Sequence, residues 1–165
     1  MKTIFTILAG SVIILTGCTM TPVALQSVGP APMTDDNNGG TGQLRVFTAT
    51  ESHEIGDNTF FHPHTGYRIC TSDGKFLKYV PNHQNYTDEM ATVVRLPVGN
   101  YMVYAQCESY NLVSVPVVIL AGKTTVVHLE TTWQPPSTAT TDQLVYLPNG
   151  RPVGWRSYPS HESPN

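Results

Sequence analysis

Short alternating segments separated by turn residues fill the region 43–130, and this pattern constrains the fold more than any other feature of the chain. In the first segment Leu44, Val46 and Thr48 alternate with their neighbours, which is the period of a β-strand with one buried face. The pair Asp73-Gly74 separates two further segments and favours a tight hairpin turn, because its residues accept positive φ. Seven strands are expected, at residues 43–49, 67–70, 75–80, 92–96, 101–105, 113–120 and 124–129.

These strands predict an all-β domain over residues 43–130, folded as an antiparallel seven-stranded sandwich of the immunoglobulin-like kind. Charged residues make up only 13% of the chain, and Thr, Asn, Tyr, Gly and Pro take their place, as expected for strands and turns. Pro116 lies inside the expected strand 113–120 and cannot donate a backbone hydrogen bond. We therefore expect that strand to lie at a sheet edge or to bulge at Pro116.

The region 131–165 is expected to form a Pro/Thr-rich linker and then a small β-hairpin tail, because Asn149-Gly150 separates two extended segments. An isolated hairpin is marginally stable in water. The tail must therefore either dock on the sandwich, through Tyr146 and Trp155, or remain loose.

The sequence from Val94 to Ala105, which contains Leu96-Pro97-Val98-Gly99-Asn100-Tyr101, and the segment Ala121–Leu129 (AGKTTVVHL) resemble the end of carboxypeptidase-regulatory-like domains. The resemblance covers residues 91–130 well and the first half of the domain loosely. It implies a transthyretin-like, or prealbumin-like, β-sandwich that serves as a non-catalytic accessory module. Because the shared motif encodes turns and strands, it implies no activity.

The N-terminus has the layout of a bacterial export signal, in which Lys2 precedes the apolar segment 4–15. That segment is shorter than the roughly 20 residues a helix needs to cross a bilayer. The sequence Leu15-Thr16-Gly17-Cys18 that ends it is similar to the lipobox of bacterial lipoproteins. The resemblance implies that residues 1–17 are a helical signal peptide, removed when acyl chains such as palmitate are attached to Cys18.

Thr19 follows Cys18, and in lipoproteins a residue other than Asp at this position implies sorting to the outer membrane. We therefore expect an exported protein, lipid-anchored to the cell envelope at the periplasmic or outer face of the outer membrane. The polar region 18–42 is expected to be a flexible tether. With a formal net charge of −3 and no basic cluster, the chain is not expected to bind nucleic acid.

Two cysteines remain in the expected mature chain, Cys70 and Cys107. An exported protein can keep a disulfide, but the spacing of the two residues does not show that their Cα atoms come close enough to bridge. They either form a disulfide or are two separate small hydrophobic residues.

Four histidines, His53, His62, His64 and His83, form the only suggestive polar group. A zinc site at His62 and His64 would need a third ligand, such as His53, Glu54 or His83, in a tetrahedral arrangement. The alternative is a polar loop whose imidazoles bond backbone carbonyls or water. No catalytic motif occurs, so neither an enzyme nor a cofactor is expected.

Aromatic residues near the expected loops, chiefly Trp133 and Trp155, are either stacking platforms for sugars or residues buried under the tail. The sequence thus predicts a non-catalytic structural or protein-binding module that is attached to the membrane and meets another envelope protein. The alternatives are a glycan-binding module and a metal-binding accessory protein that uses His62 and His64.

Overall fold

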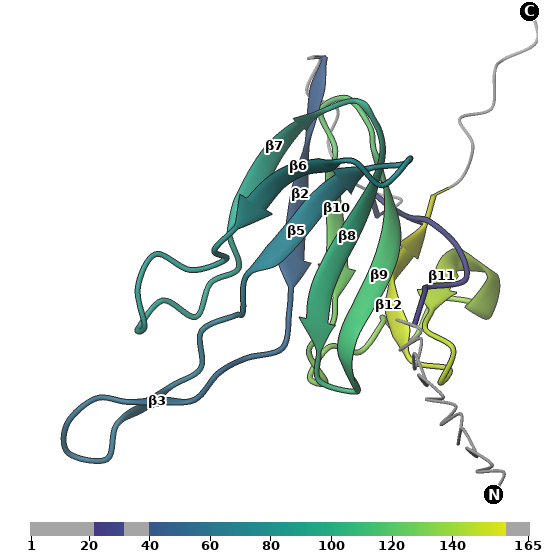
Figure 1. The fold of residues 1–165 in the computed structure, drawn as a ribbon. Coiled ribbons are helices and arrows are strands. Elements are labelled where there is room, and N and C mark those ends of the chain that lie inside the picture. The colour runs from purple at the N-terminus through teal and green to yellow at the C-terminus, as the bar shows by residue number, and fades with distance from the viewer. Residues whose placement is uncertain (1–21, 32–39, 158–165) are drawn as a thin grey trace, which may run out of the picture.

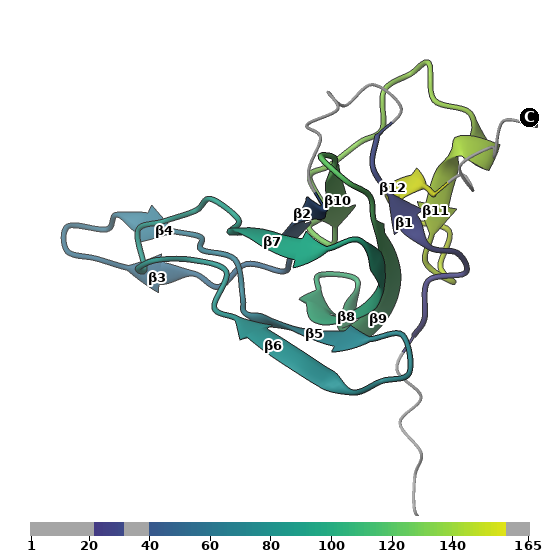
Figure 2. The same cartoon turned by 90° about the horizontal axis from the view of Figure 1, so that it is seen from above.

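The computed structural model describes residues 22–31 and 40–157, which fold into a sandwich of two β-sheets (Figure 1). The larger sheet has seven strands in the order β11-β12-β1-β9-β8-β5-β6, and the smaller sheet has three in the order β10-β2-β7. A two-stranded hairpin, β3–β4, extends away from the sandwich (Figure 2). The predicted all-β sandwich is confirmed, whereas the expected signal helix and Cys18 lie outside the described residues.

The strand bounds are β1 Val28–Gly29, β2 Thr41–Phe47, β3 His53–Glu54, β4 Phe60–Phe61, β5 Tyr67–Thr71, β6 Phe76–Val80, β7 Val93–Pro97, β8 Gly99–Cys107, β9 Tyr110–Ile119, β10 Thr124–His128, β11 Leu144–Tyr146 and β12 Pro152–Arg156. One 3₁₀ turn, Thr141–Gln143, is the only helical element in the described part of the chain. None of the described residues belongs to a helix long and apolar enough to span a bilayer.

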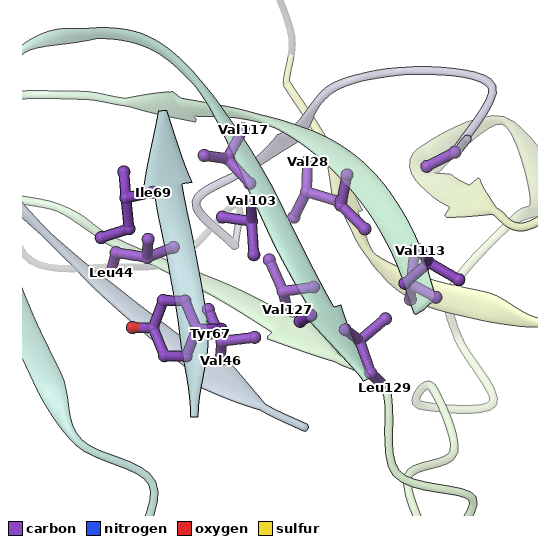
Figure 3. Packing of buried hydrophobic residues seen from close by; sticks show 14 of the residues in the cluster. Val28, Leu44, Val46, Tyr67, Ile69, Val103, Val113, Val117, Val127 and Leu129 are labelled. Atoms are coloured by element: carbon purple, nitrogen blue, oxygen red, sulfur yellow. The ribbon is translucent and has the colours of Figure 1, made fainter. Parts of the chain in front are cut away.

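The core lies between the two sheets and is rich in valine (Figure 3). Leu44 and Val46 of β2 alternate with half-buried residues, as the sequence predicted, and face Val103 of β8 across the sandwich. Val127 of β10 is also fully buried. Each such side chain contributes about 1.5–3 kcal/mol when it leaves water, so these strands hold the two layers together.

Most neighbouring strands are antiparallel, but two pairs are parallel. β2 runs parallel to β10, with Leu44 opposite Thr125, and β1 runs parallel to β9, with Val28 opposite Val117. Local patterning does not report these pairings, because parallel neighbours are joined by long connections rather than by hairpins.

The expectation for Pro116 was wrong, because β9 is an interior strand between β8 and β1 and has no bulge at Pro116. The reason lies in the neighbouring segment. Residues 22–29 run beside β9 and pair with it at two places. Near the start, Ser114 forms backbone hydrogen bonds with Pro22 and Ala24, and farther along Val28 lies opposite Val117. Between these two places the pairing is interrupted. Backbone groups of Ser114 and Pro116 face the same side of β9, since they are two residues apart. The Pro116 nitrogen, which carries no hydrogen, therefore faces the stretch in which the pairing with residues 22–29 is interrupted, and no ladder hydrogen bond is lost.

Both ends of the described chain belong to the larger sheet. β1 pairs with β12, with Gly29 opposite Trp155, so residues 22–31 are part of the fold and not of the expected flexible tether. The C-terminal hairpin docks on the sandwich, which is one of the two alternatives left open by the sequence. Fully buried Val153 anchors it, while Tyr146 and Trp155 are only half-buried.

Candidate functional site

The edge strand β6 exposes almost all of its side chains. Phe76, Leu77 and Tyr79 are 58%, 47% and 54% exposed, whereas only Val80 is buried. A bulge in the pairing of β5 with β6 at Ile69/Cys70 adds a residue to β6 and disturbs its alternation. Three large apolar side chains are therefore in contact with water at an edge of the sheet that pairs with no other strand among the described residues.

Strand register places Tyr79 and Phe76 in two rows across the outer face of the larger sheet. In the first row Tyr79 of β6 lies opposite Arg68 of β5, which lies opposite Tyr104 of β8. In the second row, Phe76, Cys70 and Met102 are neighbours in the same way. Cross-strand neighbours have Cβ atoms about 4.5–5.5 Å apart, so each row forms a continuous surface.

A groove of about 500 Å³ lies over these rows. Gly66 helps to form it, because a Cβ atom at this position would collide with the Tyr79 phenol. The ring of Tyr79 can therefore lie against the start of β5. The groove is lined by aromatic, apolar and polar side chains, chiefly those of Arg68, Cys70, Phe76, Tyr79, Tyr104 and Leu112.

The surroundings of the groove are basic. Arg68 of β5 lines the groove, and Lys75 lies in the turn that joins β5 to β6. Asp73 is the only acidic residue of that hairpin. Asp73 is held within the turn, where hydrogen bonds from the Thr71 side chain and from backbone amides lower its pKa. A ligand in the groove therefore meets a positive charge from Arg68 next to aromatic rings.

The two cysteines are free and buried in the structure, which supports the second of the two alternatives. Cys70 lies opposite Met102 on β8, and Cys107 is five residues farther along the same strand. That separation is about 17 Å, far beyond the Cα distance of at most about 7 Å that a disulfide requires. The possible Cys70–Cys107 disulfide is therefore absent.

The histidines are spread over the base of the β3–β4 hairpin and the loop 81–92. The Nδ1 atom of His64 is 2.8 Å from the Thr48 carbonyl oxygen, and the Nδ1 atom of His83 is 2.9 Å from the His64 carbonyl oxygen. The ring of His53 packs 4.5 Å from that of Tyr86, and the backbone N–H of His62 donates to Glu89. Within residues 22–31 and 40–157, no three potential metal ligands lie together. The imidazoles of His64 and His83 bond carbonyls, as the alternative interpretation expected.

The two tryptophans lie away from the groove. The ring of Trp133 stacks on that of His128, with centroids 4.2 Å apart and planes 4° apart, and His128 also stacks on Phe47. Trp155 is half-buried in β12 between β11 and β1. Both side chains are half-buried, and neither lines the groove.

The chain matches no protein-family model, no curated protein and no solved structure.

The groove residues Phe76, Tyr79 and Tyr104 were not predicted as a site from the sequence. The available signal was the segment Phe76-Leu77-Lys78-Tyr79, which carries three large apolar residues without strand alternation. Which of them share a face with Arg68 depends on the bulge and on the pairing with β5, and neither can be read from β6 alone.

Proposed function

We propose that this chain is a lipid-anchored, non-catalytic protein-binding module of the bacterial envelope, and that it binds an extended segment of a partner protein along β6. The observation that carries this proposal is the open edge of β6, with Phe76, Leu77 and Tyr79 exposed beside the groove. A monomeric protein normally protects such an edge with charges, prolines or a covering segment. On β6 a single charged residue, Lys78, interrupts the apolar series.

The chemistry of binding follows from the strand edge. An added strand bonds to the free N–H and C=O groups of β6, which gives affinity, and places alternate side chains against the adjoining face, which gives specificity. Here the adjoining face offers Tyr79, Tyr104 and Phe76 to an apolar side chain. Arg68 offers a forked set of donors to a carboxylate or carbonyl.

Anchoring through Cys18 completes the proposal. The support is the signal-like segment 1–17 and the sequence Leu15-Thr16-Gly17-Cys18, with Thr19 favouring the outer membrane. Two or three acyl chains hold a protein far more firmly than the single chain that binds only marginally.

The test is a site-directed photocrosslink in the intact cell. A photoreactive phenylalanine analogue replaces Tyr79 or, as the matched control, Met90, an equally exposed apolar residue in the loop 81–92. We expect one discrete adduct from position 79 and none of that mass from position 90. The double variant Phe76→Lys and Leu77→Lys, which places charges along this edge, should abolish the adduct with the analogue still at 79. If both positions gave the same adducts, β6 would not be the binding strand.

A glycan ligand is the second candidate, because Tyr79, Arg68 and Tyr104 form a row of two rings around a hydrogen-bond donor on a sheet face. It predicts that purified cell-wall polysaccharide protects Tyr79 and Tyr104 from chemical modification. Trp133 and Trp155, the possible sugar platforms of the sequence, do not line the groove and are not part of this candidate.

A further inference from the structure

The folded domain begins very close to the proposed lipid anchor. Pro22, the first described residue, already belongs to the larger sheet, because its carbonyl oxygen accepts the backbone N–H of Ser114 at 2.9 Å. Only four residue steps separate Cys18 from Pro22. Four steps span at most about 14 Å when fully extended. The connection is therefore shorter than the tether of 18–42 expected from composition.

Exposed apolar side chains gather where the chain enters the sheet. Leu25 is 74% exposed, the highest value among the large apolar residues that the structure describes, and Val23 is 49% exposed. Val23 pairs with Ser114 of β9, and Leu112, two residues earlier on β9, is 46% exposed. We call Val23 and Leu25 the entry patch, and Leu112, which lines the groove, lies next to it.

The segment that carries the patch is uncharged. Residues 19–27 contain no Asp, Glu, Lys or Arg. Transfer of this segment into the headgroup region therefore involves no desolvation of a charged side chain, which is the main cost of bringing protein next to lipid.

We propose that the entry patch rests on the same bilayer that holds the acyl chains of Cys18, so that the sandwich is seated on the membrane in one orientation rather than suspended above it. The inference rests on the anchoring part of the proposed function. The short connection keeps the patch at high effective concentration beside the lipid, so even weak apolar contacts are populated. Leu25 and Val23 supply those contacts.

Seating in this orientation also positions the groove. Val23 pairs with Ser114, Ser114 with Tyr104, Tyr104 with Arg68, and Arg68 with Tyr79, so patch and groove lie along one cross-strand row. Four strand spacings separate the ends of this row, about 19 Å. A partner that binds at β6 is then held within roughly that distance of the lipid surface, which favours a partner segment that is itself close to the membrane.

The experiment uses the full-length lipidated protein, purified from membranes and reconstituted in vesicles of phosphatidylethanolamine and phosphatidylglycerol. An environment-sensitive fluorophore is attached through Leu25→Cys or, as the control, through Ala121→Cys. Ala121 is exposed beyond the end of β9, far from the β8–β9 turn. Labelling is carried out in a Cys70→Ser background, because Cys70 lines the groove. Cys107 is buried, so the fluorophore is attached selectively at the new cysteine. Quenchers carried on the lipid chains then report contact with the bilayer.

We expect quenching at position 25 at least three-fold stronger than at position 121, and a loss of at least half of it when ten Gly/Ser residues are inserted between Thr19 and Pro22. Equal quenching at the two positions, or no effect of the insertion, would overturn the inference. Flotation separates this result from the anchoring proposal. Protein that floats with the vesicles without quenching at position 25 is anchored but not seated, whereas protein that does not float is not anchored.

Discussion

The side chain of Asn82 joins the loop after β6 to the opposite sheet, since its Nδ2 group donates to the Val46 carbonyl oxygen of β2 at 2.9 Å. The same group lies 3.1 Å from Thr48 Oγ1, and Asn82 Oδ1 accepts the Thr92 backbone N–H at 3.0 Å. Asn82 is fully buried and has a φ of 71°, a conformation that asparagine accepts more readily than most residues. Side chain and backbone thus both select asparagine here.

We predict that Asn82→Ala lowers the free energy of unfolding by about 2–4 kcal/mol, because it leaves two buried backbone groups unpaired and adds strain at positive φ. Asn82→Gly should cost less, because it relieves only the strain. Urea denaturation of both variants measures the difference. Asn85→Ala, in the exposed part of the same loop, is the control and should change stability by less than about 1 kcal/mol. An Asn82→Ala protein as stable as the control would contradict this account.

Tyr67 presents the opposite situation. Its ring is buried in the core, and its hydroxyl oxygen is buried without a hydrogen-bond partner among the described residues. Burial raises the pKa of this phenol well above its ordinary value, so it remains protonated. We predict that Tyr67→Phe leaves the stability unchanged or raises it by up to about 1 kcal/mol, because an unsatisfied group is removed.

Tyr67→Ala should instead cost about 3–5 kcal/mol, as expected for the loss of a buried ring. Thermal and urea unfolding of the two variants test the pair of expectations. A Tyr67→Phe protein destabilised by more than about 1 kcal/mol would show that the hydroxyl has a partner in solution.

Glu108 is expected to make stability depend on pH. Although partial burial raises its pKa, hydrogen bonding to Thr131 and the nearby charges of Arg151 and His64 outweigh that effect and hold the pKa below its ordinary value of 4.5. Because the folded-state pKa is the lower one, the carboxylate stabilises the fold fully above the unfolded-state pKa. That contribution is lost as the pH falls through the folded-state pKa.

We therefore predict that Glu108→Gln is less stable than the wild type by at most about 1 kcal/mol near neutral pH, since the group is largely exposed. The difference should shrink as the pH falls below about 4.5. Urea titrations of both proteins between neutral and acidic pH provide the measurement. A difference that grows on acidification would mean that the sign of the shift is wrong.

The elements that could be predicted from the sequence are those whose signals are local. Leu44 and Val46 of β2, and Thr48 directly after it, are fully buried as their alternation required. Gly74, with a φ of 86°, lies in the β5–β6 turn as Asp73-Gly74 indicated. β1 carries no comparable signal. It is two residues long and exists only because β9 and β12 lie on either side of it.

The same distinction explains why the groove could not be predicted. Arg68 and Tyr79 are eleven positions apart in the sequence and become neighbours through the β5–β6 register. A bulge shifts that register by one residue, which decides the face of the sheet on which each side chain of β6 lies. The groove therefore depends on which strands pair and in what register, and the sequence of one segment does not reveal it.

The separation of Cys70 and Cys107 leads to a last prediction, on the redox state of the exported protein. Since the two residues are about 17 Å apart along the β5–β8 pair, no rotation of the side chains can bring the sulfur atoms within bonding distance. The purified protein should have the same mass with and without reductant, and should release two thiols per chain to a thiol reagent in urea.

In the folded protein, Cys70 should react before Cys107. Cys70 is 7% exposed and lines the groove, whereas Cys107 is 4% exposed and does not line it. Reactivity of a thiol depends on access as well as on thiolate content. Modification of Cys70 should also block binding at β6, because Phe76 and Met102 flank it across the strands. If the wild type loses binding after treatment with the reagent and a Cys70→Ser variant does not, the loss of binding is caused by modification of Cys70. A variant that loses binding on treatment would instead show that a residue other than Cys70 is responsible.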